Sequence, residues 1–365
     1  MKSWLKKLII AGGLLIFSGV LMFLFKNFPN FFFPWYRQAS RFLMSVLSSV
    51  TGLFPYAVWD IAAVVLIVAF IVSIIFMIVK KKRFLNWLST VVLIASAMGS
   101  FVICGWMLNH YGPTIAEDIG LEMPEKFNKE ELGEAMLYYF DEAAKIVFDF
   151  PEEIAEGPDR ETFLELGRIA GKSYVKLADT YPTLDGSTAP VKGLLLYSEP
   201  MLYQGFTGEF MPLSGESTVA FSKDGVSLPF TMCHEAAHRL GYASEEACNF
   251  AAFLACEASD DVRFRFSGYY SAFIYLYNAI YGEDQNYLWK ILDTRKGDAY
   301  EKVYEYCDIV SKAYEPYDTP IADVGETVND TYLKTFSEES GVKSYGEVVQ
   351  DLTAWYLKNC RMEHS

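Results

Sequence analysis

The first third of the chain alternates between long apolar runs and short charged clusters. Three runs carry almost no charge: residues 8–25, residues 58–79, in which Asp60 is the exception, and residues 84–108. Each run is close to the roughly 20 residues that an α-helix needs to cross a bilayer. The pattern therefore predicts three spans within a membrane region of residues 1–109.

Basic residues flank these runs on one side. Lys2, Lys6 and Lys7 precede the first run, and residues 80–83 are all basic. Because positively charged flanks stay in the cytoplasm, we expect a multi-pass protein of the cytoplasmic membrane with its N-terminus inside. Residues 26–57 and everything after about residue 109 are then outside. A cleaved signal peptide is the alternative for the first run, but no small-residue cleavage site follows it.

The loop between the first two spans has its own hydrophobic periodicity. Apolar residues recur at helical spacing over residues 38–54, which predicts an amphipathic helix on the outer face of the bilayer. Arg37 and Arg41 disfavour a fourth span here.

After residue 110 the pattern becomes that of a mainly helical domain with a small sheet. Alternating segments at residues 193–198 and 216–222 predict strands. We expect the fold class to be mainly α, with transmembrane helices followed by an α+β, zincin-like domain over residues 110–365. The predicted helices of this domain cover residues 128–148, 160–181, 230–240, 245–259, 261–281, 284–293, 297–314, 324–338 and 345–359.

Composition agrees with a membrane protein whose outer domain is acidic. Hydrophobic residues make up 52% of the chain, and the net charge is −15, although Asp60 is the first acidic residue along it. Almost all acidic residues therefore lie after residue 109. Because such a domain repels phosphate groups, nucleic acid is excluded as a partner. Six cysteines do not form a disulfide scaffold, and only Cys307 and Cys360 are expected to be free to pair.

Two of the four histidines lie in one pentapeptide, His234-Glu-Ala-Ala-His238. On a helix, positions i and i+4 share a face, so both imidazoles can bind one Zn²⁺ ion. Pro229 fits the start of such a helix and Gly241 its end. The alternative is an amphipathic helix with two hydrogen-bonded histidines. Manganese or cobalt also suits these ligand types.

A second helix opens after Ser244, a candidate N-cap. Glu245 in its first turn is the expected third metal ligand, with Glu246 as the alternative. Asn249, one turn after Glu245, is placed to orient a ligand histidine. Helix-dipole stabilisation alone is the other explanation for the acidic pair.

This chemistry predicts a metallopeptidase in which Glu235 takes a proton from zinc-activated water. Arg265, Tyr269 and Tyr345 are candidates to stabilise the oxyanion. An edge strand before the motif is expected to hold an extended substrate by strand addition. The residues assigned to that strand are Glu216, Ser217, Thr218, Val219 and Ala220.

These segments resemble the bacterial membrane-anchored DUF3810 family and, more distantly, gluzincin metallopeptidases of the membrane-embedded heat-shock and CaaX-processing type. The resemblance implies a peptidase-like fold. In the gluzincin pattern the third ligand opens a Glu-x-x-Ala-Asp/Asn run, and residues 245–249 match it with Cys248 in place of Ala, which favours Glu245. The matching segments are residues 206–212, 229–238, 241–245, 247–250, 266–269 and 341–346.

The expected partners are the lipid bilayer and a peptide or protein substrate that is membrane-tethered or secreted. Two other functions fit the same residues. One is a non-catalytic, zinc-containing membrane sensor or assembly factor, although such a protein has no need of Glu235. The other is a zinc hydrolase that acts on cell-envelope cross-links.

Overall fold

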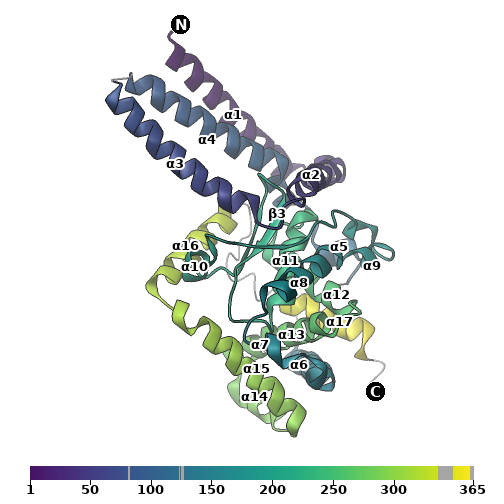
Figure 1. Ribbon diagram of the computed structural model, residues 1–365. Helices are drawn as coiled ribbons and strands as arrows, with labels where there is room; N and C mark the ends of the chain where they lie inside the picture. The colour runs from purple at the N-terminus through teal and green to yellow at the C-terminus, as the bar shows by residue number, and fades with distance from the viewer. Residues whose placement is uncertain (81–82, 123, 125–126, 336–347, 362–365) are drawn as a thin grey trace.

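The protein consists of long apolar helices that project from one side of a mainly helical body (Figure 1). The computed structural model describes residues 1–80, 83–122, 124, 127–335 and 348–361. A three-stranded sheet lies where the two parts meet. This arrangement agrees with the predicted fold class at the level of secondary structure.

Three helices are long and apolar enough to cross a membrane: α1 (Ser3–Asn27), α3 (Val58–Val79) and α4 (Phe84–Gly105). They coincide with the three predicted runs. Helices α1 and α4 pack together, and the side chains that they bury are Ala11, Ser18 and Phe25 of α1 and Ser89, Ser96 and Ser100 of α4. In α3, whose residues are all described, only Asp60 is buried.

The predicted amphipathic helix is present but longer than expected, because α2 covers Pro29–Thr51. The buried face of α2 packs against the body, where Arg37 pairs with Asp118 and Arg41 donates to the carbonyl of Leu240. The opposite face carries exposed apolar side chains: Phe31, Trp35, Phe42, Val46 and Val50.

The sheet has the strand order β1-β3-β2, with β1 (Lys192–Gly193) parallel and β2 (Gly208–Met211) antiparallel to β3 (Glu216–Val219). The β2–β3 turn ends at Gly215, which has a φ of 68°. A Cβ atom there would lie 2.8 Å from the carbonyl oxygen of Met44 in α2. Glycine thus allows the hairpin to pack directly on the amphipathic helix.

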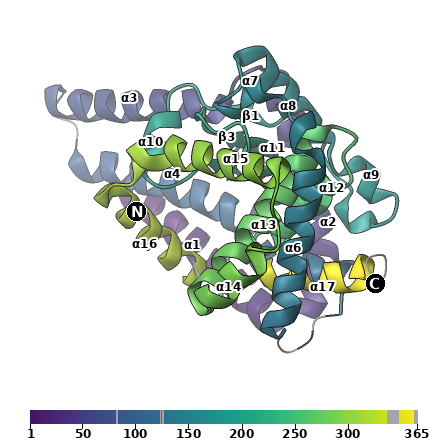
Figure 2. The same ribbon diagram turned by 90° about the horizontal axis from the view of Figure 1, so that it is seen from below.

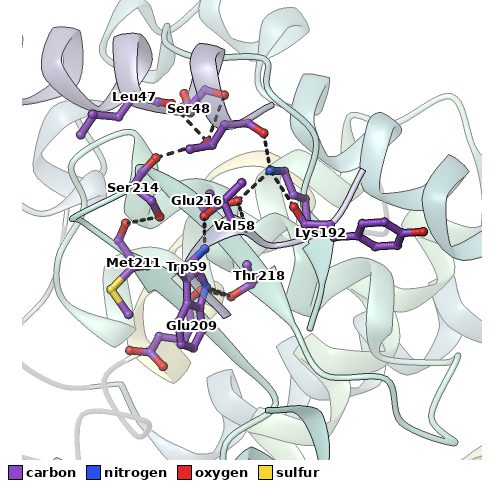
Figure 3. Close-up of polar contacts among 12 residues, drawn as sticks. Leu47, Ser48, Val58, Trp59, Lys192, Glu209, Met211, Ser214, Glu216 and Thr218 are labelled. Carbon is purple, nitrogen blue, oxygen red and sulfur yellow. Dashed lines mark hydrogen bonds and ion pairs between the residues drawn. The ribbon is translucent and has the colours of Figure 1, made fainter. Parts of the chain in front are cut away.

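A buried polar network ties the sheet to the start of α3 (Figure 3). The Glu216 carboxylate accepts hydrogen bonds from the backbone N–H groups of Val58 and Trp59, at 2.7 and 2.9 Å. Lys192 donates to the same carboxylate at 2.7 Å and to the carbonyl oxygens of Thr51 and Tyr56. These contacts fix the N-terminal end of an apolar helix against the sheet.

The predicted strand over residues 193–198 is mostly wrong, since β1 contains only two residues. The backbone N–H groups of Leu195 and Leu196 instead donate to the carboxylate of Asp60, at 2.7 and 2.8 Å. Because they are bound to a side chain of α3, they are not available for a strand ladder.

The core of the body is helical. Figure 2 shows α6 and α13 side by side, and α11 and α12 also pack on α13. The predicted capping box at Asn128 and Glu131 opens α6, whereas the predicted helix over residues 160–181 is two helices, α8 and α9. The remaining helices are α5 (Ile115–Asp118), α6 (Lys129–Ile146), α7 (Glu152–Ala155), α8 (Arg160–Lys172), α9 (Val175–Ala178), α10 (Ser198–Tyr203), α11 (Leu228–Arg239), α12 (Glu245–Glu257), α13 (Val262–Glu283), α14 (Gln285–Leu292), α15 (Asp298–Tyr314), α16 (Pro320–Thr335) and α17 (Val348–Asn359), with 3₁₀ turns η1 (Met107–Tyr111), η2 (Val147–Asp149), η3 (Pro182–Leu184) and η4 (Glu315–Tyr317).

Candidate metal centre

Helix α11 places the two motif histidines side by side. Pro229 lies in its first turn, and Gly241, with a φ of 87°, follows its end. The Nε2 atoms of His234 and His238 are 3.1 Å apart, and both side chains are largely buried. The local sequence signals therefore predicted this helix and its ends correctly.

Glu245, the first residue of α12, faces both imidazoles. Its carboxylate oxygens lie 3.1 Å from Nε2 of His234 and 3.8 Å from Nε2 of His238. A tetrahedral ion bound at roughly 2.0–2.1 Å holds its ligand atoms about 3.3 Å from one another. The three side chains therefore have the spacing of a metal-ligand set. Ser244 caps α12 as expected, by accepting a hydrogen bond from the N–H of Ala247.

The outward-facing nitrogen of each histidine is held by another group. Nδ1 of His234 lies 2.8 Å from Oδ1 of Asn249, and Nδ1 of His238 lies 3.0 Å from the carbonyl oxygen of Tyr242. Such contacts fix the ring orientation and the tautomer, so that Nε2 of each ring is directed inward. Asn249 thus has the position that was predicted for it.

Cys248 offers a competing ligand set. His234, His238 and Cys248 each have a ligand atom within 4.8 Å of the others. However, Sγ of Cys248 lies 3.1 Å from Nδ1 of His238 and 3.2 Å from the Tyr242 carbonyl oxygen. It is therefore on the Nδ1 side of the ring, and a metal bound to it there would break the Tyr242 contact. We favour Glu245 because it faces both Nε2 atoms.

The charges of these groups are strongly coupled. Burial opposes the charged form of His234, but the Glu245 carboxylate outweighs it and raises the pKa of His234 to about 9. Burial likewise opposes ionisation of Glu245, yet the hydrogen bond and charge of His234 lower the pKa of Glu245 to about 2. Burial and the His234 charge lower the pKa of His238 to about 4. The site thus holds a carboxylate that requires a positive charge beside it, which suits a divalent cation.

Glu235 lies next to His234 and is not one of the three candidate ligands. It is 4% exposed, and its Oε2 atom has no hydrogen-bond partner among the described residues. Burial raises the pKa of Glu235 to about 8, with the charges of Glu245 and Glu209 acting in the same direction against that of His234. A Cβ atom at Gly208 would lie 2.5 Å from Oε1 of Glu235, so a side chain at position 208 would displace this carboxylate. An unpartnered carboxylate oxygen beside a metal-ligand set fits a group that accepts a proton.

The centre opens into a cavity of about 740 Å³. One wall comes from the end of α4 and the turn after it, through Val102, Trp106 and Met107. A second wall is β2 with its flanking residues 205–212, and a third is α13. The lining includes the carboxylates of Glu209, Glu235 and Glu245 and, among the described residues, no lysine or arginine.

Two of the three candidates for oxyanion stabilisation, Tyr269 and Arg265, lie away from the centre. Tyr269 packs on Phe253 in the core, and Arg265 donates to the carbonyl oxygens of Ser259 and Asp260 at the end of α12. Neither lines the cavity. Tyr345 lies outside the described residues. Glu246, the alternative ligand, is also not part of the cavity lining.

The predicted edge strand is in the middle of the sheet. Strand β3 pairs with β1 on one side and with β2 on the other, so residues 216–219 have no free edge. Their side chains have structural contacts instead: Ser217 donates to the carbonyl of Glu235 at 2.6 Å, and Thr218 to that of Glu209 at 2.7 Å. Ala220 is buried beyond the strand.

Sequence reasoning missed two parts of the cavity. Strand β2 is an edge strand, and it lines the cavity next to Glu235. The cavity face of α13 carries Tyr270, Ser271, Ile274, Tyr275 and Asn278, which follow one another at helical spacing. Tyr269 is one position earlier, a rotation of about 100° away from that face. Cys307 and Cys360, the two cysteines that the sequence leaves available to pair, are not joined by a disulfide.

Comparison with curated proteins gave no match, and neither did comparison with solved structures. A family model described as "Protein of unknown function (DUF3810)" matches residues 35–353, a range that contains most of α2, two of the three apolar helices and all residues of the candidate metal centre. The chain therefore belongs to the DUF3810 family of proteins of unknown function.

Proposed function

We propose that this protein is a membrane-anchored, zinc-dependent peptidase whose outer domain has a zincin-like fold. The observation that carries the proposal is the convergence of His234, His238 and Glu245, at 3.1–3.8 Å, beside the unpartnered Oε2 of Glu235. The ligands come from two consecutive helices, and the carboxylate beside them opens into a cavity large enough for several residues of a peptide.

Each residue of the candidate site has a separate role in the proposed mechanism. His234, His238 and Glu245 hold the metal, while Asn249 and the Tyr242 carbonyl orient the two imidazoles. When bound, a divalent metal supplies Lewis-acid polarisation of the scissile carbonyl and activation of water. Glu235 is the general base, and the proton is held at Oε2 before it passes to the leaving amine.

Strand β2 is the candidate platform for the substrate. Among the described residues it pairs only with β3, so its other edge is open to an added strand. A peptide along that edge passes Gly208, whose Cα position lies against the Glu235 carboxylate. Tyr275 lines the opposite wall and is a candidate to contact the oxyanion, in place of Tyr269.

Metal content tests the ligand assignment. The full-length protein is purified in lipid nanodiscs, and zinc is measured for wild type, Glu245→Ala and the matched control Glu246→Ala. We expect zinc in wild type and in the control and its loss in Glu245→Ala. Retention in Glu245→Ala together with loss in Cys248→Ser would transfer the third position to Cys248. Absence of any bound metal from folded wild-type protein would remove the basis of the proposal.

Hydrolysis tests the role of Glu235. A mixture of peptides is incubated with wild type and with Glu235→Gln, and new termini are identified by mass spectrometry. A general base contributes roughly 10²–10⁴ in rate, so the variant should bind zinc normally yet cleave at least about 100-fold more slowly. Equal cleavage by the two proteins would exclude Glu235 as the base.

We also propose that the metal centre is outside the cytoplasmic membrane. Lys7 of α1 donates to Thr90 of α4, so the basic N-terminus lies at the same end of the bundle as Lys80 and Arg83, which flank α3 and α4. Positive charge at that end favours a cytoplasmic location for it, and the body is at the other end. Labelling of cysteines introduced at Lys2 and Lys223 in intact cells tests this: an impermeant reagent should modify position 223 alone.

A further inference from the structure

The wall of the metal cavity is built partly from a membrane helix. Val102, Trp106 and Met107 line the cavity, and they belong to the apolar stretch Phe84–Tyr111 that is long enough to cross a bilayer. Trp106 also donates from Nε1 to the carbonyl oxygen of the metal ligand His238, at 2.9 Å. The metal centre is therefore one side chain away from the end of a span.

The length of α4 places this end at the surface of the bilayer. Its 22 residues rise by about 33 Å at 1.5 Å per residue, slightly more than the roughly 30 Å of the hydrocarbon core. With Phe84 at one boundary, Gly105 is at the other and Trp106 is at the interface, where tryptophan is favoured. The exposed apolar face of α2 lies at the same junction (Figure 1).

The sheet that lines the cavity also contacts α3. Trp59, in the first turn of α3, donates to Thr218, and Thr218 in turn donates to the carbonyl of the cavity residue Glu209. Beyond this contact α3 buries none of its apolar side chains, all of which are described. An apolar segment in the bilayer can therefore lie against α3, two hydrogen bonds away from the cavity strand β2.

We infer that the substrate is a polypeptide held in the bilayer by an apolar anchor, and that the cleaved bond lies within a few residues of that anchor. This inference rests on the proposed peptidase function and specifies its substrate class. The cavity wall formed by Val102, Trp106 and Met107 is apolar and lies at the depth of the membrane surface. An extended chain rises about 3.3 Å per residue, so a few residues connect an anchor at the depth of Trp106 to Glu235.

Matched substrates test this inference. One peptide sequence cleaved by the wild-type protein is prepared in soluble form, with an acyl anchor and with a transmembrane-helix anchor. The anchored forms carry flexible spacers of about 5 or 20 residues, over which effective concentration falls roughly eightfold by a −3/2 power of length. Full-length protein and substrate are combined in the same lipid vesicles.

The expected result is that an anchored, short-spacer substrate is cleaved with a kcat/KM at least about 100-fold above that of the soluble peptide. Comparison of kcat/KM for the acyl-anchored and helix-anchored substrates then shows which kind of anchor the enzyme prefers. Equal cleavage of the soluble peptide, or failure to cut the short-spacer form, would overturn the inference while the peptidase proposal stands. Absence of cleavage in every form by zinc-loaded protein would overturn the peptidase proposal and the inference with it.

Crosslinking gives a readout that is independent of turnover. A photoreactive residue replaces Val102 in the Glu235→Gln variant, with the same replacement at Phe101 as control, because Phe101 has the same depth but does not line the cavity. We expect the anchored peptide to crosslink at position 102 and soluble peptide to compete weakly. Equal crosslinking at positions 101 and 102 would contradict the inference that the anchored substrate passes Val102 on its way into the cavity.

Discussion

The ion pair between Lys192 and Glu216 permits a quantitative prediction for Lys192→Met. The two side chains are 4% and 1% exposed, and Lys192 donates to Glu216, Thr51 and Tyr56. Removing one partner of a buried ion pair costs about 3–5 kcal/mol, because the other charge stays buried and unpaired. Glu216 keeps two backbone N–H donors and the favourable N-terminal dipole of α3, so we expect the lower end, about 3 kcal/mol.

Hydrogen exchange measures this cost at the right place. The N–H groups of Val58 and Trp59 are in the first turn of α3, where no intrahelical acceptor exists, so their protection depends on Glu216. A loss of about 3 kcal/mol corresponds to exchange that is roughly 100-fold faster, at 1.4 kcal/mol per factor of ten. The control is Lys176→Met, which removes an exposed pair with Asp260 and should change little.

Two results would refute this reasoning. One is unchanged exchange at Val58 and Trp59 in a Lys192→Met protein that is folded, as judged by protection in α12. The other concerns the double variant Lys192→Met/Glu216→Gln, which leaves no buried charge. If exchange at Val58 and Trp59 is faster in the double variant than in Lys192→Met, the destabilisation caused by Lys192→Met does not come from an unpaired carboxylate.

Three further predictions concern the cavity and the core. Gly208→Ala should reduce cleavage by tenfold or more with zinc content unchanged, because the new Cβ displaces Glu235, and about 1 Å of misplacement can cost 10²-fold. A normal kcat would show that strand β2 moves to accommodate the methyl group and that Glu235 keeps its position. Two peptides that differ only in one lysine or glutamine are compared, and the ratio is kcat/KM for the lysine peptide over that for the glutamine peptide. Glu209→Gln should lower this ratio by roughly fivefold, because a carboxylate that lines the cavity is then neutral. An unchanged ratio would show that Glu209 does not take part in recognition. Burial raises the pKa of Glu257 to about 7 from 4.5. The folded state therefore keeps a proton that the unfolded chain releases between those pH values, and stability falls as pH rises through that window. Thermal unfolding of Glu257→Gln should show a weaker decline there, and an identical decline would assign it to another group.

Local signals predicted the metal helices well. Pro229, Gly241 and the Ser244 cap act within one turn of their own positions, so the ends of α11 and α12 follow from the sequence. The same holds for the capping box at Asn128. Periods of 3.6 residues and runs of about 20 apolar residues likewise depend on the segment alone.

The errors concern contacts between distant segments. Whether β3 is an edge depends on β2, whose four residues Gly208–Met211 have no alternating pattern of their own. The shortened β1 depends on Asp60, more than 130 residues away. Tyr269 and Tyr270 differ only in the rotation of α13 against its neighbours, which tertiary packing decides.

The hydrogen bond from Trp106 to the carbonyl of His238 has a consequence for the biogenesis of the protein. A soluble fragment that begins near residue 110 lacks Trp106, the Val58 and Trp59 donors to Glu216, and the Arg41 donor to the Leu240 carbonyl. In such a fragment the buried Glu216 carboxylate keeps Lys192 as a donor but loses both backbone donors. The carbonyl oxygens of His238 and Leu240, at the end of α11, lose their side-chain donors as well. We therefore expect a newly made chain to complete the candidate metal site only after α4, the third apolar helix, has packed against the body.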